Sequence, residues 1–232
     1  MVYIQKGSAP ASLTSYLATH PTATYDNVKR HKNIRIDIYN FLIAEQYGLC
    51  AYCMSRILYN PITDRNIQIE HYIPQSDSTA VVGSSLTLGQ IKSVDYTNMI
   101  GVCDGGKQYN RDKSLSGLEN LSCDAHRGNT PLTMNPLDVS FFSTRVFEYK
   151  NSGKIDSANS AIKKDLTETL NLNVQRLVIL RKQAMNKVIF MISKGKITFT
   201  NKNQTIAALK TPKNGKLEAF FDVSIFFIDK LV

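Results

Sequence analysis

The stretch Cys50-Ala51-Tyr52-Cys53 is a C-x-x-C motif, and the other two cysteines of the 232-residue chain are Cys103 and Cys123. The two-residue spacer allows both thiolates of a tight turn to face one tetrahedral Zn²⁺, and Cys103 and Cys123 can complete a four-sulfur ligand set. We therefore expect one structural zinc ion. Free thiols remain an alternative because the last two cysteines are far apart in the sequence. A redox pair in the first motif would need a thioredoxin-like βαβ context, which the surrounding pattern does not provide.

An acid and a histidine follow in Ile69-Glu70-His71-Tyr72-Ile73-Pro74, at the end of an alternating segment, residues 66–71, that predicts a β-strand. Adjacent strand side chains point to opposite faces, so Glu70 and His71 can serve one site only if the strand ends there. Glu70 would then bind a metal ion, and His71 would act as general base for a water molecule. In isolation, such a pair is more often a surface carboxylate beside a hydrogen-bonded histidine.

Four motifs follow one another along the middle of the chain. They are the C-x-x-C pair, Glu70-His71, Asn98-Met99-Ile100-Gly101-Val102-Cys103 and Cys123-Asp124-Ala125-His126. This order resembles the signature of the HNH endonucleases. The resemblance implies a ββα-metal core with zinc knuckles, in which His71 is the general base and Asn98 orients it. It further implies that Glu70 and His126 bind a catalytic Mg²⁺ or Mn²⁺ ion and that the protein hydrolyses phosphodiester bonds.

Further stretches extend the pattern on both sides of these motifs. They are Cys50 to Met54, Glu70-His71-Tyr72-Ile73-Pro74-Gln75-Ser76, Asp95-Tyr96-Thr97-Asn98-Met99, Cys103-Asp104-Gly105, Gly128-Asn129 and Asn135-Pro136-Leu137. Together they resemble a narrower group, the HNH proteins of retron-associated and Septu-type antiphage systems. This resemblance implies a role in antiphage defence, with DNA as the expected nucleic acid and an ATPase subunit as partner. The chain has no Walker-type phosphate loop, so any ATP hydrolysis would belong to that partner.

The end of the motif series departs from the usual HNH pattern. Residues 104–122 are inserted between the last two cysteines, so the fourth zinc ligand could be Cys123 or His126. The last metal-binding position could also be read at Asn129. We favour His126 there because imidazole is the stronger ligand for a borderline divalent metal. Arg127 also flanks this stretch and could touch phosphates.

The hydrophobic pattern predicts an α+β protein that is mainly helical, in three parts. Residues 1–48 form an N-terminal helical segment, with helices near residues 11–18, capped by Ser8 or Ser12, and over residues 33–48, closed by a C-cap glycine. Residues 49–137 form the zinc-stabilised HNH core. Residues 138–232 form a mainly helical region that begins with a hairpin around residues 151–153.

Two helices and an apolar end are expected within that last region. Leu166 and Leu170 continue a helical step, Asn173 is the expected N-cap of a second helix that ends before Gly195, and the apolar residues 217–232 are expected in the core.

The net charge of +9 is unevenly distributed. Residues 139–232 hold 16 Lys or Arg against 7 Asp or Glu, so the whole excess lies there. A basic region beside a neutral one favours contact with nucleic acid, although basic surfaces are common and charge alone leaves that question open. The longest uncharged runs are rich in Ser, Thr and Gly, and the first residues lack the apolar segment of a signal peptide, so we expect a cytoplasmic protein without membrane contact.

A different class of function competes with the nuclease. The four cysteines could fold a zinc-knuckle protein that binds nucleic acid or acts as a scaffold, in which Glu70, His71 and His126 perform no chemistry.

Overall fold

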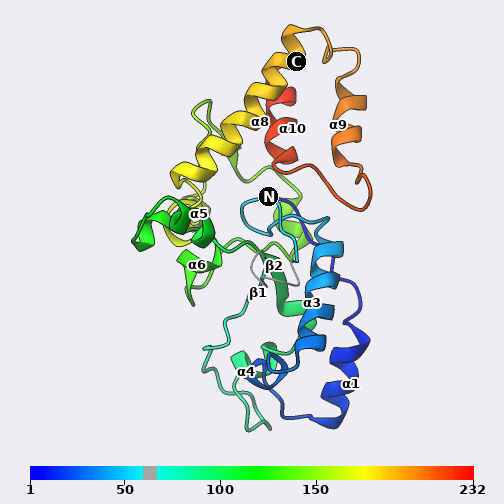
Figure 1. Cartoon of the computed structure of the whole chain (residues 1–232), viewed down its shortest axis with the longest axis vertical. Coiled ribbons are helices and arrows are strands. Elements are labelled where there is room, and N and C mark those ends of the chain that lie inside the picture. Colours follow the sequence, from blue (N-terminus) through cyan, green and yellow to red (C-terminus); the bar gives the residue numbers. More distant parts are fainter. Residues whose placement is uncertain (60–66) are drawn as a thin grey trace.

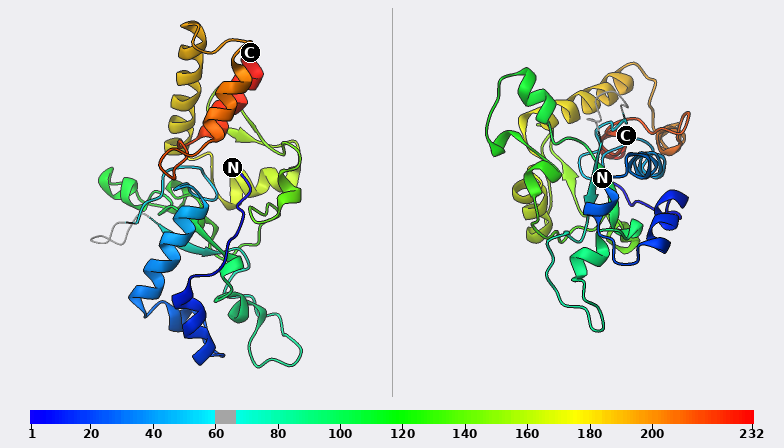
Figure 2. Two further views of the ribbon diagram at one scale, coloured as in Figure 1. Left: turned by 90° about the vertical axis from the view of Figure 1, so that its right-hand side faces the viewer. Right: turned by 60° about the horizontal axis from the view of Figure 1, so that its bottom comes forward.

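The computed structural model describes residues 1–59 and 67–232, and this part of the chain has an α+β fold with two small antiparallel sheets. Figure 1 shows an elongated molecule, with N-terminal helices at one end, strands β1 and β2 in the middle and C-terminal helices at the other end. Figure 2 shows the same order after a quarter turn. The described part of the chain contains no helix that is both long enough and apolar enough to cross a membrane.

Three helices form the N-terminal end. They are α1 (Ala11–Thr19), α2 (Tyr25–Val28) and α3 (Lys32–Glu45). Both helices that the sequence predicts are present, but α3 ends three residues early. Gly48 then adopts a φ of 71° and donates its amide hydrogen to the carbonyl of Ile43, as expected for a glycine that terminates a helix. The predicted serine cap of α1 is wrong, because Pro10 holds the N-cap position and no side chain bonds there.

The middle of the molecule is built on the pairing of β1 (Gln68–His71) with β2 (Met99–Val102), in which Glu70 lies opposite Ile100. The predicted strand is confirmed over Gln68–His71, while Ile67 lies just before β1 and Asn66 lies outside the described residues. Short helices connect and flank the two strands. They are α4 (Leu88–Lys92), η1 (Tyr96–Asn98), α5 (Lys107–Asp112), η2 (Leu118–Asn120) and α6 (Asp124–Arg127).

The C-terminal part contains the predicted hairpin and helices. Its elements are η3 (Val139–Phe142), β3 (Glu148–Tyr149), β4 (Ile155–Asp156), α7 (Ser160–Lys164), the π-helix η4 (Asp165–Thr169), α8 (Gln175–Ser193), α9 (Lys202–Lys210) and α10 (Phe221–Leu231). The apolar α10 packs against both α8 and α9. The N-cap prediction for Asn173 is wrong, because its side chain bonds both backbone groups of Ile155 in β4.

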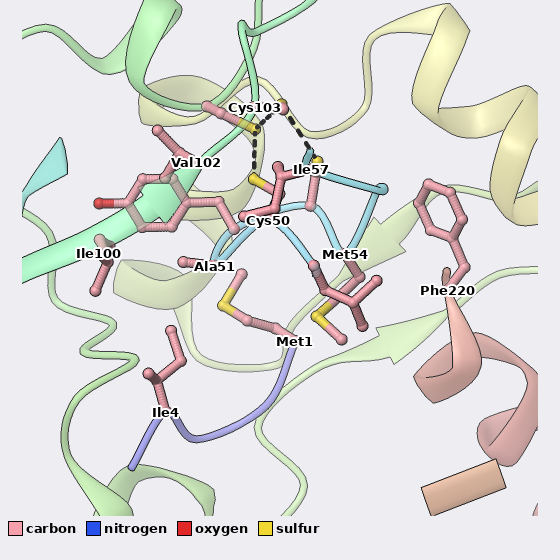
Figure 3. Close-up of a cluster of buried hydrophobic side chains, with 14 of the residues drawn as sticks. Met1, Ile4, Cys50, Ala51, Met54, Ile57, Ile100, Val102, Cys103 and Phe220 are labelled. Carbon is pink, nitrogen blue, oxygen red and sulfur yellow. Dashed lines mark hydrogen bonds between the residues drawn. The ribbon is translucent and has the colours of Figure 1, made fainter. Parts of the chain in front are cut away.

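One hydrophobic core runs through all three parts. The four cysteines belong to it, and Figure 3 shows side chains from distant segments around them, including Met1, Ile57, Ile100 and Phe220. The three segments of the sequence therefore share a core, and their boundaries at residues 48 and 137 stay predictions.

Candidate metal centre and adjoining cleft

The four cysteines come together in one buried cluster. Their sulfur atoms all lie within 4.8 Å of one another, with Cys53 to Cys103 at 3.7 Å, Cys103 to Cys123 at 3.7 Å and Cys50 to Cys123 at 3.9 Å. Four sulfurs at Zn–S distances of about 2.3 Å in a tetrahedron are about 3.8 Å apart. The cluster therefore has the size and donor set of a structural zinc site and could hold such a metal.

Three separate pieces of backbone bring these cysteines together. Cys50 and Cys53 lie in a tight turn after α3, closed by bonds from the amide of Cys50 to Ser55 and from Met54 back to Cys50. Cys103 directly follows β2, and Cys123 is the N-cap residue of α6 with a φ of 57°. The expected cluster is confirmed although the insertion of residues 104–122 separates the last two cysteines.

The surroundings of the cluster suit negative charge. Hydrogen bonds from the neighbouring thiols lower the pKa of Cys53 well below its usual value, whereas burial raises the pKa of Cys50. The buried guanidinium of Arg181 interacts electrostatically with Cys53 and Cys123 and donates to the carbonyls of Gly153 and Leu172. A zinc ion with four thiolates would have a net charge of −2, which the guanidinium of Arg181 would stabilise.

A cleft of about 180 Å³ lies beside the end of β1. Its lining residues are Ile69, Glu70, His71, Pro74, Gln75, Asp124, Gly128 and Asn129. Adjacent residues within a strand would point to opposite faces. Glu70 and His71 can both line this cleft because β1 ends at His71.

Glu70 is buried at this cleft and has an unusual pKa. Burial and the nearby carboxylate of Asp124 raise the pKa of Glu70 to about 8, although Arg127 acts in the opposite direction. The carboxylates of Glu70 and Asp124 both line the cleft and offer the oxygen ligands that a divalent cation prefers.

His71 is held as a neutral ring with one nitrogen fixed. Its Nε2 lies 2.8 Å from the carbonyl oxygen of Ser93, so Nε2 carries the proton, and the side-chain Nε2 of Gln75 donates to Nδ1 at 3.1 Å. The ring of Tyr25 packs against the imidazole edge-on. Burial lowers the pKa of His71 to about 4, so the ring is neutral at neutral pH and its Nδ1 carries a lone pair.

Asn98 acts on the loop after β1 and does not bond the imidazole. Its side chain accepts from the amide of Ile73 at 2.8 Å and donates to the carbonyls of Ile73 and Lys92, both at 3.0 Å. It thereby fixes the loop between His71 and Pro74.

His126 does not share the cleft with Glu70 and His71. It is half-buried, its Nδ1 bonds the carbonyl oxygen of Thr169 at 3.0 Å, and it does not line the described cleft. Asp124 and Asn129 line it instead. Sequence reasoning missed Asp124; the available signal was an acid directly after the last cysteine.

Arg127 is buried and saturated with partners, so it is not available to a phosphate in this structure. Its guanidinium forms an ion pair with Glu70, and it also donates to the hydroxyl of Tyr52 and to the carbonyls of His71, Tyr72 and Thr130. It connects α6 to the end of β1.

Comparison with protein-family models and with curated proteins finds no match to this chain. What the cleft can do is therefore argued from its chemistry. It combines a neutral imidazole, two carboxylates suited to a divalent cation and a fixed turn, next to a site that could hold zinc.

Proposed function

We propose that this protein is a metal-dependent endonuclease of the HNH type, with zinc at the four cysteines and Mg²⁺ or Mn²⁺ at the cleft. The observation that carries the proposal is the meeting of Glu70, Asp124 and a neutral His71 at one cleft, where β1 ends and α6 begins. Two antiparallel strands and α6, which follows them after the inserted α5 and η2, with cysteines at the end of β2 and the start of α6, support the proposal of a ββα-metal core.

The residues would divide the work of hydrolysis. The Nδ1 atom of His71 would give up its bond from the side chain of Gln75 and accept a proton from a water molecule, whose oxygen attacks phosphorus as the bond to the 3′ oxygen breaks. The carbonyl of Ser93 keeps the opposite nitrogen protonated and so selects Nδ1 as the base. When bound by Glu70 and Asp124, a divalent ion would stabilise the negative charge that develops on the leaving oxygen.

Asn98 contributes by holding the loop that carries the cleft wall. Its bonds to Ile73 keep the chain turned after His71, so its role in the proposal is to orient the base through the backbone. His126 stays an alternative metal ligand from the motif resemblance, and Asp124 is the ligand that the geometry favours.

The biological setting belongs to the same proposal. The motif resemblance supports a role in antiphage defence with an ATPase partner, and the basic residues after residue 138 support contact with DNA. A zinc-knuckle protein without catalysis is the competing function.

One experiment separates these two functions. The purified full chain is incubated with supercoiled plasmid DNA and Mn²⁺ or Mg²⁺, with and without EDTA. We expect nicking that requires the metal and that falls by at least about 10²-fold in His71→Ala, which should keep its zinc. His20→Ala is the matched control, because this histidine is exposed and bonds only locally within the described chain. Wild-type cleavage by His71→Ala would overturn the assignment, and no cleavage by any zinc-loaded form would favour the non-catalytic function.

A further inference from the structure

Tyr52 connects the four-cysteine centre with the cleft. It occupies the spacer of the C-x-x-C motif, between Cys50 and Cys53, and its side chain is buried with 1% exposure. Its hydroxyl donates to Oε1 of Glu70 at 3.1 Å and accepts from Nη1 of Arg127 at 3.0 Å. A residue of the cysteine turn is thus in direct contact with the proposed ligand of the catalytic metal.

The two oxygens of Glu70 have different surroundings. Oε1 is engaged by Tyr52 and by the ion pair with Arg127, whereas Oε2 accepts one bond, from the amide of His71 at 3.2 Å. Two donors on one oxygen fix the rotation of the carboxylate. Oε2 keeps lone pairs that can bind a cation together with Asp124.

Arg127 and Tyr52 are not equivalent in this arrangement. Arg127 is held by backbone carbonyls of the loops around it, so its position is set by α6 and the end of β1. Tyr52 comes from the cysteine turn, and it transmits the position of that turn to Glu70. Cys123 precedes Asp124 directly, so both sides of the cleft are attached to the cysteine cluster.

We infer that Tyr52 is a positioning residue, which fixes the carboxylate of Glu70 for the divalent metal and ties it to the four-cysteine centre. This inference rests on the proposed function, because it assumes a divalent ion at Glu70. It adds that the hydroxyl of Tyr52 links the two metal sites on the Glu70 side, as the Cys123–Asp124 peptide does on the other side.

The test uses the full zinc-loaded chain and measures Mn²⁺ binding directly, from the electron paramagnetic resonance signal of free Mn²⁺. Tyr52→Phe removes only the hydroxyl. We expect one zinc per chain to be retained, Mn²⁺ affinity to fall about tenfold, as for one hydrogen bond to a charged group, and cleavage at saturating Mn²⁺ to stay near the wild-type rate.

Tyr149→Phe is the matched control. It also removes a buried tyrosine hydroxyl that donates to a carboxylate, that of Asp222, but outside the cleft. This variant should leave Mn²⁺ affinity unchanged. In a Glu70→Gln background, Tyr52→Phe should have less than a twofold further effect, because Tyr52 acts through the Glu70 carboxylate.

The outcomes separate the inference from the proposed function. If the wild-type protein binds no Mn²⁺, the proposed function fails. If it binds Mn²⁺ and Tyr52→Phe binds it equally well, the inference is wrong while the nuclease proposal stands. A Tyr52→Phe protein that loses zinc or unfolds would show that the hydroxyl is purely structural, and would also overturn the inference.

Discussion

The side-chain amide of Gln46 pairs with Gly101 as a neighbouring β-strand would. Its nitrogen donates to the carbonyl of Gly101 at 2.7 Å, and its oxygen accepts from the amide of Gly101 at 2.6 Å. The same nitrogen donates to the carbonyl of Leu49 at 2.8 Å. The side chain of this buried glutamine thus connects β2 by hydrogen bonds to the end of α3 and to the turn that contains the first two cysteines.

Gln46→Ala should destabilise the protein by about 2 kcal/mol, because it leaves the buried amide of Gly101 without a partner, whereas the carbonyl of Gly101 keeps the bond from the amide of Ala51. The free energy of unfolding is measured by urea denaturation of the zinc-loaded protein. Gln90→Ala is the matched control, since Gln90 bonds only at the start of a short, less buried helix, and it should cost about 1 kcal/mol or less. Equal effects of the two substitutions would contradict the strand-like role of Gln46.

The zinc prediction concerns metal content. Freshly purified, reduced protein should contain one zinc per chain by elemental analysis, and removal of the zinc by a chelator should lower the melting temperature sharply, because metal binding is coupled to folding. Cys50→Ser should lose most of the zinc. Ser55→Ala is the control. The Ser55 hydroxyl lies 2.9 Å from the sulfur of Cys53 but is not one of the four proposed zinc ligands, so this variant should keep one zinc per chain. A Cys50→Ser protein that melts like the wild type would remove the claim.

The cysteine cluster and the Glu70-His71 pair could be predicted because each contains metal-binding or proton-accepting residues close together in the sequence, Cys50 with Cys53 and Glu70 with His71. The choice among Asp124, His126 and Asn129 could not. Asp124 and His126 lie on α6, where each residue turns the side-chain direction by about 100°, so which of them faces the cleft depends on the rotation of that helix, while Asn129 lies beyond the end of α6. That rotation is set by the unusual backbone of Cys123, which the sequence does not reveal.

Other features left no periodic signal in the sequence. The pairing of Gln46 with Gly101 is a contact between a helix end and a strand, and α9 has no buried residue that would mark a hydrophobic face. Asn173 is a residue type that often caps a helix, but its side-chain amide bonds the backbone of Ile155 in β4. An asparagine side chain can bond either a helix N-terminus or a strand, and the tertiary packing places it against the strand.

Asp124→Asn and His126→Gln should separate the two possible metal ligands. We expect Asp124→Asn to lower cleavage at least about 10²-fold and to respond partly to raised Mn²⁺, because a neutral amide is a weaker ligand for that ion. His126→Gln should remain within about threefold of the wild-type rate, since His126 bonds Thr169 and does not line the described cleft. The opposite ranking in a plasmid-nicking assay would restore His126 as the ligand.

The basic C-terminal part should contribute to DNA affinity through exposed lysines. Lys194→Glu with Lys196→Glu should weaken binding and reduce the slope of log affinity against log salt by about 2, as expected when two phosphate contacts are lost. The control is Arg30→Glu with Lys32→Glu, which changes the net charge equally at exposed N-terminal positions. Identical salt slopes for both double variants, measured by fluorescence anisotropy, would contradict a role for this end.

The raised pKa of Glu70 predicts how pH affects stability in the absence of a divalent ion. The pKa is about 8 in the folded protein and near 4.5 in the unfolded chain, so the folded state binds more protons between these values and stability falls as pH rises through them. His71 acts oppositely, because its folded pKa of about 4 lies below its usual 6.5, but its contribution is complete above about pH 6.5. Between pH 6.5 and 8 the Glu70 effect should therefore dominate.

The zinc-loaded protein should accordingly lose about 1 kcal/mol of unfolding free energy between pH 6.5 and 8, as measured by urea denaturation. Saturating Mn²⁺ should abolish this loss, because the bound cation stabilises the deprotonated carboxylate, and Mn²⁺ affinity should rise over the same pH range. Glu70→Gln is the control and should show a flat profile. A wild-type protein whose stability is constant from pH 6.5 to 8, with Mn²⁺ affinity equally constant, would show that Glu70 is ionised before the metal binds.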